Sequence, residues 1–460
     1  MTREHDTGRS ASLFTVPRAL KSVIFVALLF AAITSSYLEH EAAAPSASGV
    51  DAAPGPAVPS STSVPRRPKP AIPTTPPTVA PSAAAPPTIP NLAPAKRLRD
   101  LWRDKLSPEY VTFDAGCASD TSAAGLAAFF AQPLGPIDGF DGPRVYPLGD
   151  GRNLWMLQDT FIDYAGGQDS FAHMNYANST ALIQDGTCFT ALQRGTTTDA
   201  QSFEQGTGTI SFDHYYWPAG GMVTDGKLQM FWMEMVRDPE IGGPLDGLSL
   251  HPVKTWLATY DVASMQRLSF VPAPNPGVAP VYGYHVASDE TWTYLFANSY
   301  QQNLALEGGY SNGPHSATKM YLARVPLGRL DATQQYWNGV GFVDQPTAAV
   351  PISSRYFTEN SMIPQRFGGK WISATKVDGF LGTAVSIDIA DDPWGPYTTV
   401  KLLPATPRGS PDSVVTYHAF ILPWLDPSGG LIVSLSQIPL ALGATDAPPR
   451  YRPNFWLISL

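Results

Sequence analysis

The sequence predicts an all-β chain whose globular part is a five-bladed β-propeller, preceded by a membrane anchor and a disordered Pro-rich linker. From about residue 110 onward, short runs rich in Val, Ile, Tyr, Phe, Trp and Thr alternate with Gly, Asp, Asn and Pro. Helical patterns are confined to residues 122–132 and 95–105. The strand-like runs group into repeats of roughly 65–75 residues, and such radial repetition is typical of a propeller. A β-sandwich with additional sheets is the alternative fold.

The N-terminal region predicts export of the chain. Residues 22–38 (SVIFVALLFAAITSSYL) carry no charge, with basic residues before them and acidic residues after them. This polarity puts residues 1–21 in the cytoplasm and the rest of the chain outside. We interpret 22–38 as an uncleaved signal anchor, with a cleaved signal peptide and a buried core helix as alternatives. The flanking charges are Arg3, Arg9, Arg18 and Lys21 on one side and Glu39 and Glu41 on the other.

Residues 39–95 form a Pro/Ala-rich tract that cannot build a core. Proline donates no backbone hydrogen bond and biases its neighbours toward extended conformations. We expect a disordered spacer that holds residues 96–460 within or beyond a cell-wall layer, although a merely tolerated linker would have the same composition.

Composition excludes several classes of function. The chain has 39 acidic and 30 basic residues among 460, giving a net charge of −9, so we expect no nucleic-acid partner. Its two cysteines, Cys117 and Cys188, are too few for a Cys-rich metal site. Outside the cytoplasm they would form a disulfide, and two buried thiols are the alternative. No metal-binding motif stands out.

The five predicted blades begin near residues 144, 215, 279, 354 and 414. The first four have four strands each, and the fifth has three. We expect a strand near residues 110–113 to complete the fifth blade and close the ring. Hairpin turns are indicated at Asp150-Gly151, Asp225-Gly226 and Gly368-Gly369.

Polar and aromatic side chains occur near the start of every predicted inner strand. Because inner strands converge at one end of a propeller channel, we expect a ligand site there, although packing alone also brings Tyr and His into strands. The residues are Asp141 and Arg144; Asp213, His214 and Trp217; Tyr282, Tyr284 and His285; Glu359 and Asn360; and Tyr417 and His418.

Asp159, in LWMLQDTFID, is a further candidate. A carboxylate among apolar strand residues is costly to bury unless it is paired or used. Arg144 or Arg152 would be its partner if its role were structural. Asn175 and Asn178 lead into the next strand and could face the same loops.

These motifs resemble a known family. An Asp before the first inner strand, a strand ending in QDTF, and an Asn-Ser before the next strand together resemble an actinobacterial cell-wall domain family linked to endo-D-arabinanases. That family is similar in turn to five-bladed furanosidase propellers such as arabinanases and fructan hydrolases. QDTF stands where GDTF is expected, so the acid is kept and the glycine before it is replaced.

The resemblance implies hydrolysis of a glycosidic bond by two carboxylates. It maps onto Asp141 and Asp159, and we add Glu359 as a third catalytic acid because apolar neighbours would raise its pKa toward that of a proton donor. The expected substrate-binding residues are Arg144, Asn178, Trp217, Tyr282, His285, Tyr417 and His418.

We therefore expect an exported glycoside hydrolase acting on an arabinose-containing or related cell-wall polysaccharide. One alternative is a catalytically inactive propeller that binds cell-wall glycan or a partner protein. Another is a different propeller enzyme, such as a lyase or a phosphate-directed hydrolase. We expect no cofactor, apart from a structural calcium ion if His285, His418 and nearby acids converge in the channel.

Overall fold

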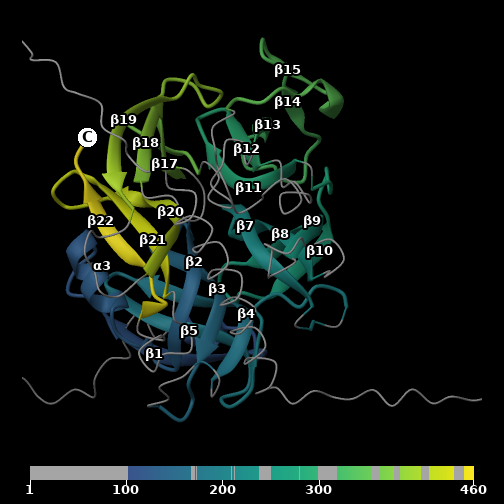
Figure 1. Ribbon diagram of the computed structural model, residues 1–460. Helices are drawn as coiled ribbons and strands as arrows, with labels where there is room; N and C mark the ends of the chain where they lie inside the picture. The colour runs from purple at the N-terminus through teal and green to yellow at the C-terminus, as the bar shows by residue number, and fades with distance from the viewer. Residues whose placement is uncertain are drawn as a thin grey trace, which may run out of the picture.

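Five antiparallel sheets surround a common centre in the computed structural model, which confirms the five-bladed β-propeller (Figure 1). The structure describes residues 102–166, 171, 174–208, 210–211, 213–237, 250–278, 280–298, 319–353, 363–377, 384–405, 414–439 and 450–460. The expected cytoplasmic tail (1–21), anchor (22–38) and linker (39–95) lie outside these residues. Within the described ranges, no helix is both long and apolar enough to cross a membrane.

In each sheet the strand nearest the channel comes first in the sequence, and later strands lie farther out. The exception is β1, which comes first in the chain but lies at the outer edge of the first sheet. The first sheet has the spatial order β1 (Tyr110–Cys117), β5 (Cys188–Gly195), β4 (Asn175–Asp185), β3 (Arg152–Ile162) and β2 (Ile137–Pro147), with β6 (Ala200–Gln201) beside β5. The second contains β7 (His214–Thr224), β8 (Lys227–Arg237), β9 (Leu250–Asp261) and β10 (Arg267–Pro272).

The remaining sheets follow the same plan. The third contains β11 (Val281–Ser288), β12 (Trp292–Asn298), β13 (Met320–Pro326), β14 (Gln335–Trp337) and β15 (Phe342–Val343). The fourth contains β16 (Gln365–Phe367), β17 (Lys370–Val377), β18 (Ala384–Ala390) and β19 (Thr398–Pro404). The fifth contains β20 (Val414–Leu425), β21 (Leu431–Pro439) and β22 (Asn454–Ile458). The fourth strand predicted for the third blade is thus two short strands.

Turn chemistry fixes the hairpins where the sequence predicts them. Asp225 and Gly226 have φ values of 51° and 69°, and Gly368 and Gly369 have φ values of 55° and 78°. Two consecutive positive φ angles define the type I′ turn, whose twist matches that of the flanking strands.

Ring closure differs from the expectation. The strand near residues 110–113 is part of β1, which pairs with β5 of the first blade and not with the fifth blade. Cys117 lies opposite Cys188 in this pairing, and the two form a disulfide. The prediction that this strand completes the fifth blade was therefore wrong.

Helix α3 (Ala123–Phe130) packs against β22, the outer strand of the fifth blade. This confirms the helix predicted over 122–132, and the Ser122 side chain caps it by accepting a hydrogen bond from the Gly125 amide. Of the helix predicted over 95–105, the described part contains only the 3-10 turn η1 (Arg103–Lys105); a second such turn is η3 (Pro346–Ala348).

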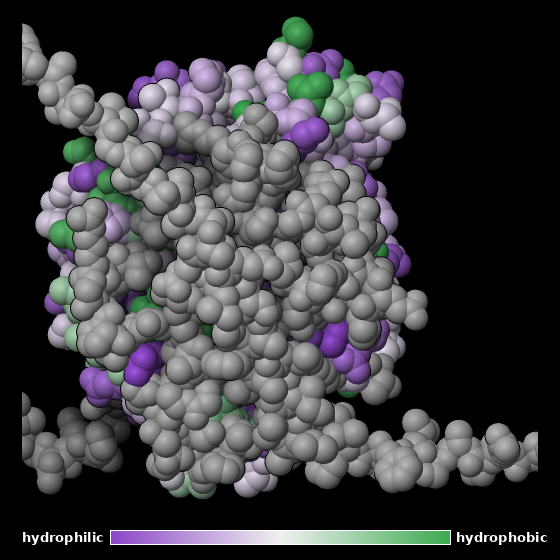
Figure 2. Space-filling model, in the orientation of Figure 1, coloured by the Kyte–Doolittle hydropathy of each residue, from purple (hydrophilic) through white to green (hydrophobic). Residues whose placement is uncertain are grey.

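Apolar packing between blades holds the inner strands in place. Trp155 of β3 is fully buried and contacts Phe130 of α3, Phe189 of β5 and Phe455 of β22. This cluster joins the first blade to the fifth, so it also fixes β2, which lies between them. On the face shown in Figure 2, the hydrophobic surface of the described residues occurs in small separate areas near the periphery.

Candidate active site

Two aspartates lie on neighbouring strands at irregular points of the first blade. Asp141 is on β2, where the pairing with β3 shifts on both sides of it, and it lies opposite Gln158. Gly142 follows with a φ of 52°, and a Cβ there would come 2.1 Å from Oε1 of Gln158, so a larger residue would be strained and would displace the Gln158 side chain. Asp159 on β3 has a φ of 40°. Such a conformation is strained for a non-glycine residue, and strain of this kind concentrates at functional sites.

The Asp141 carboxyl group is buried, with 8% of the residue exposed. The Tyr417 hydroxyl donates to Oδ2 at 2.6 Å, and the Tyr451 hydroxyl also donates to this carboxyl group. Among the described residues, Oδ1 has no hydrogen-bond partner, and Asp141 forms no ion pair. Burial, followed by repulsion from Asp159, raises the pKa of Asp141 to about 8. Asp141 therefore holds a proton at neutral pH.

Asp159 is held by donors from two other strands. The Tyr176 hydroxyl of β4 donates to its Oδ1, and Nε1 of Trp217 on β7 donates to the same oxygen at 3.2 Å. Asn178 contacts the Tyr176 hydroxyl through Nδ2 at 3.3 Å, and its own backbone amide donates to Ser202. Asp159 thus lies in a fixed position next to Asp141.

Three tyrosines surround the two acids, and their hydroxyl groups stay protonated and act as hydrogen-bond donors. Burial, reinforced by the nearby carboxyl groups, raises the pKa values of Tyr176, Tyr417 and Tyr451 well above the usual 10. We call the two aspartates, these three tyrosines and Trp217 the acid cluster.

Sequence reasoning missed Tyr176, Tyr451 and Lys376. Tyr176 lies within the MNYANS motif and could have been found there, because it is two residues before Asn178. Tyr451 is on the segment leading to β22, and no local pattern relates it to Asp141. Lys376 on β17 donates to the backbone oxygen of Thr416, the neighbour of Tyr417, and burial lowers the pKa of Lys376 to about 7.

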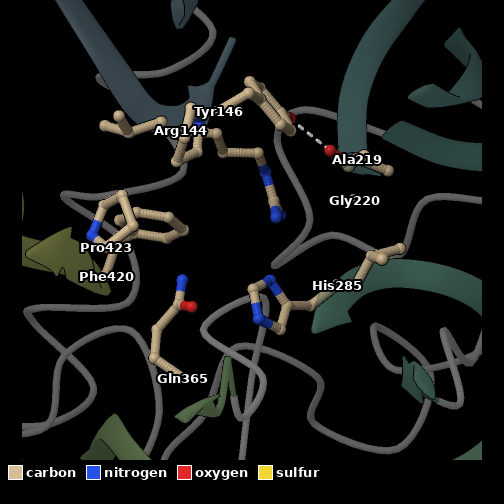
Figure 3. A pocket seen from close by; sticks show the side chains of 12 residues that line it. Arg144, Tyr146, Ala219, Gly220, His285, Gln365, Phe420 and Pro423 are labelled. Atoms are coloured by element: carbon tan, nitrogen blue, oxygen red, sulfur yellow. Dashed lines mark hydrogen bonds between the residues drawn. The ribbon is translucent and has the colours of Figure 1, made fainter. Parts of the chain in front are cut away.

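Beyond Arg144, the channel contains a cavity of about 160 Å³ that is lined by all five inner strands. The Arg144 guanidinium group points into it from β2, toward His285 of β11 and Gln365 of β16 (Figure 3). Burial, with a smaller contribution from Arg144, lowers the pKa values of His285 and His418 to about 3, so both are neutral. His418 has a φ of 49°. The described residues form no group of three His, Cys, Asp or Glu side chains that could hold a metal ion, such as the calcium expected above.

The other predicted residues lie in varied surroundings. Glu359 and Asn360 lie outside the described residues. Tyr282 is buried with its ring against Tyr336, and Tyr284 stacks on the Arg144 guanidinium group at 4.6 Å. Asp213 forms an ion pair with Arg237 at 3.7 Å, and His214 contacts Glu234 at 2.7 Å.

Neither arginine considered as a structural partner forms an ion pair with Asp159. Arg152 pairs with Asp150 at 2.6 Å, and Arg144 donates to the backbone oxygen of Tyr284 at 3.0 Å. The acid cluster is therefore held by hydroxyl and indole donors, while these two arginines are engaged elsewhere.

Fold and site together define a five-bladed propeller with an acid cluster in its first blade. The chain belongs to the family described as a domain of unknown function, DUF5005, whose model matches residues 126–459. The description of this family assigns no function and names no arabinanase. No curated protein matches the sequence.

Three solved structures are similar to this chain at low sequence identity. A candidate hydrolase from Bacteroides ovatus ATCC 8483 is 18% identical, with a TM-score of 0.54, covering 80% of this chain and 92% of that one. A GH43_1 enzyme from Xanthomonas citri is 14% identical, with a TM-score of 0.40 and coverages of 69% and 86%. A GH43 β-xylosidase/α-arabinofuranosidase from a compost metagenome is 15% identical, with a TM-score of 0.39 and coverages of 70% and 91%.

Proposed function

We propose that this protein is an exported glycoside hydrolase that acts on an arabinose-containing or related cell-wall polysaccharide. The observation that carries the proposal is the pair Asp141 and Asp159, two acids on adjacent strands whose mutual repulsion helps to raise the pKa of Asp141 to about 8. Glycosidases need one carboxyl group that keeps its proton near neutral pH and one that is ionised.

The surroundings of the two aspartates suit these opposite roles. Asp141 is protonated at neutral pH, and its buried Oδ1 has no partner among the described residues. Asp159 receives hydrogen bonds from Tyr176 and Trp217 on a single oxygen, an arrangement that stabilises a negative charge. We assign Asp159 as the base or nucleophile, and Asp141 and Glu359 as the candidate proton donors.

Support for the sugar comes from the sequence motifs. The QDTF strand and the Asn-Ser pair resemble those of the arabinanase-linked family, and both belong to the acid cluster or its immediate support: QDTF contains Asp159, and Asn178 contacts Tyr176. Trp217, only partly buried, is the aromatic side chain of this set that is best placed to meet a sugar ring.

The decisive experiment incubates the full-length protein with arabinogalactan and measures released oligosaccharides, with xylan and levan as comparison substrates. We expect products from the arabinose-containing polymer, and none from the same preparation carrying Asp159→Asn. Retention of the polymer on the protein without any products from it would instead identify a binding propeller. Products from levan or xylan alone would contradict the choice of sugar.

Location outside the cytoplasm is part of the proposal. The uncharged run 22–38 and its charge flanks support a signal anchor, and the Cys117–Cys188 disulfide is a bond typical of oxidising compartments. We expect the protein to fractionate with membranes and to be degraded by protease added outside spheroplasts. A soluble form starting near residue 45 would show that the signal is cleaved.

A further inference from the structure

The channel cavity is a separate site from the acid cluster. Its lining on β2 is Arg144 to Pro147, which follows Asp141 along the strand, and neither aspartate of the cluster lines it. The facing walls come from Gly220 of β7, His285 of β11, Gln365 of β16 and Phe420 of β20. Because all five inner strands contribute, the position of the cavity is fixed by the whole ring.

A buried positive charge in this cavity lacks a counter-charge among the described residues. Arg144 is 3% exposed, and its Nη1 donates to the backbone oxygen of Tyr284 at 3.0 Å. Its Nη2 has no hydrogen-bond partner, and no ion pair of the described residues includes Arg144. An unpaired buried charge costs several kcal/mol, so an arrangement of this kind calls for a compensating anion.

The Arg144 guanidinium is the charge that selects the ligand of this cavity, because the described groups around it are neutral. Nε2 of His285 lies 2.8 Å from the backbone oxygen of Pro364, which only accepts, so Nε2 carries a proton. Burial lowers the pKa of this histidine to about 3, so the ring is neutral. None of the described residues that line the cavity carries a carboxylate. A metal cation would be repelled by Arg144, and an apolar ligand would leave Nη2 unsatisfied.

The volume of the cavity suits a small ligand. A volume of about 160 Å³ is large enough for a small ion together with several waters, since one water needs about 10–15 Å³ of such volume. We propose that the channel binds a small monovalent inorganic anion, of the chloride class, on Nη2 of Arg144. This anion would neutralise the channel and tie the five inner strands together, independently of any glycosidase activity.

Halide dependence of the full-length protein tests the proposal. Thermal unfolding is measured in sodium chloride, bromide, nitrate, acetate and gluconate at equal ionic strength, and ³⁵Cl line widths report chloride exchange. We expect chloride, bromide and nitrate to raise the Tm by roughly 2 °C over gluconate at ten times their Kd. Bromide-soaked crystals should show an anomalous peak beside Nη2 of Arg144.

Variants separate this site from general salt effects. Arg144→Gln should lose the halide dependence, and Arg144→Lys, which keeps the charge, is used if the glutamine variant fails to fold and should retain a weaker dependence. Arg152→Gln is the matched control, since Arg152 is also buried but already pairs with Asp150; it should keep the full dependence. Equal Tm values in all salts, no bromide peak in the channel, or stabilisation by acetate but not by halides would each overturn the proposal.

Discussion

Two buried carboxyl groups in this protein have opposite surroundings. Glu204 is fully buried, and its carboxylate accepts hydrogen bonds from the Arg267 guanidinium, the Tyr260 hydroxyl and, at 2.6 Å, the Gly206 amide. Asp141 is almost as buried, but its charged neighbour is Asp159, which repels it. Burial alone therefore does not mark a catalytic acid. A cation lies beside Glu204 and a second acid lies beside Asp141, and for this reason only Asp141 is proposed as a reactive group.

The largest expected effect comes from the proposed catalytic acids. Asp159→Asn and Glu359→Gln should each reduce hydrolysis by about 10³-fold or more, because amides keep the shape and lose the proton chemistry. The Tm of each variant should change little or rise, since a repelling charge is removed. Activity within about threefold of wild type in Asp141→Asn, Asp159→Asn and Glu359→Gln would sink the assignment. If only Asp141→Asn is silent, Asp159 and Glu359 remain the proposed pair.

Glu204→Gln should show the reverse pattern. It should lower the free energy of unfolding by about 2–4 kcal/mol, because Arg267 loses its counter-charge in a largely buried pair, while the activity per folded molecule stays unchanged. Urea unfolding measures the first quantity and activity of the folded fraction the second. Glu290→Gln is the control: Glu290 pairs with Arg366 at the surface, and no measurable loss of stability is expected. A large loss of activity in folded Glu204→Gln would contradict the structural role.

The pH dependence of stability sharpens the comparison at Asp141. Its pKa is raised to about 8 in the folded protein, so between about pH 4 and pH 8 the folded state keeps a proton that the unfolded state has lost. The contribution of Asp141 to the free energy of unfolding is therefore complete below about pH 4. As the pH rises from there to about 8, this contribution declines by up to about 1.4 kcal/mol per pH unit. The difference in unfolding free energy between wild type and Asp141→Asn, measured across this range, should follow that decline. A flat difference would show that Asp141 is ionised in the folded protein.

The smallest effect is expected from a donor to the acid cluster. Tyr176→Phe removes one hydrogen bond to Asp159 and keeps the ring, so we expect about a tenfold loss in kcat, corresponding to about 1.4 kcal/mol. Tyr397→Phe is the control. It removes a hydroxyl that donates to the backbone oxygen of Pro393, four residues earlier, and it should leave kcat unchanged. Equal kcat values for Tyr176→Phe and wild type would show that the hydrogen bond from Tyr176 to Asp159 does not contribute to catalysis.

Local patterns were sufficient to predict most strands of the propeller. Alternating apolar residues and Asp-Gly or Gly-Gly turns depend on neighbours in the sequence, so β7 to β10 and the turns at Asp225 and Gly368 followed from them. The pairing of the two strands that carry Asp141 and Asp159 was predictable in the same way, because these strands form one hairpin. The catalytic role of the two aspartates came from the family resemblance and stays a prediction.

Contacts between distant segments were not predictable in this way. Tyr451 reaches Asp141 from the far end of the chain, and Tyr417, expected to stack on sugar, instead donates to Asp141 from the fifth blade. The pairing of β1 with β5 likewise depends on which edge the folded ring leaves free, and no window of sequence contains that information.

The contact of α3 with the fifth blade has a consequence for when the domain can fold. The Ala123 amide donates to Asp426 at 2.9 Å, across 303 positions of sequence, and Arg452 donates to the backbone oxygen of Ala131 at 2.7 Å, across 321. Bringing such remote segments together is entropically slow, and these contacts cannot form until Asp426 and Arg452 have been synthesised. The ring therefore stays open while the first four blades are made, and an open ring is a state in which a polypeptide can still be threaded through a translocation pore.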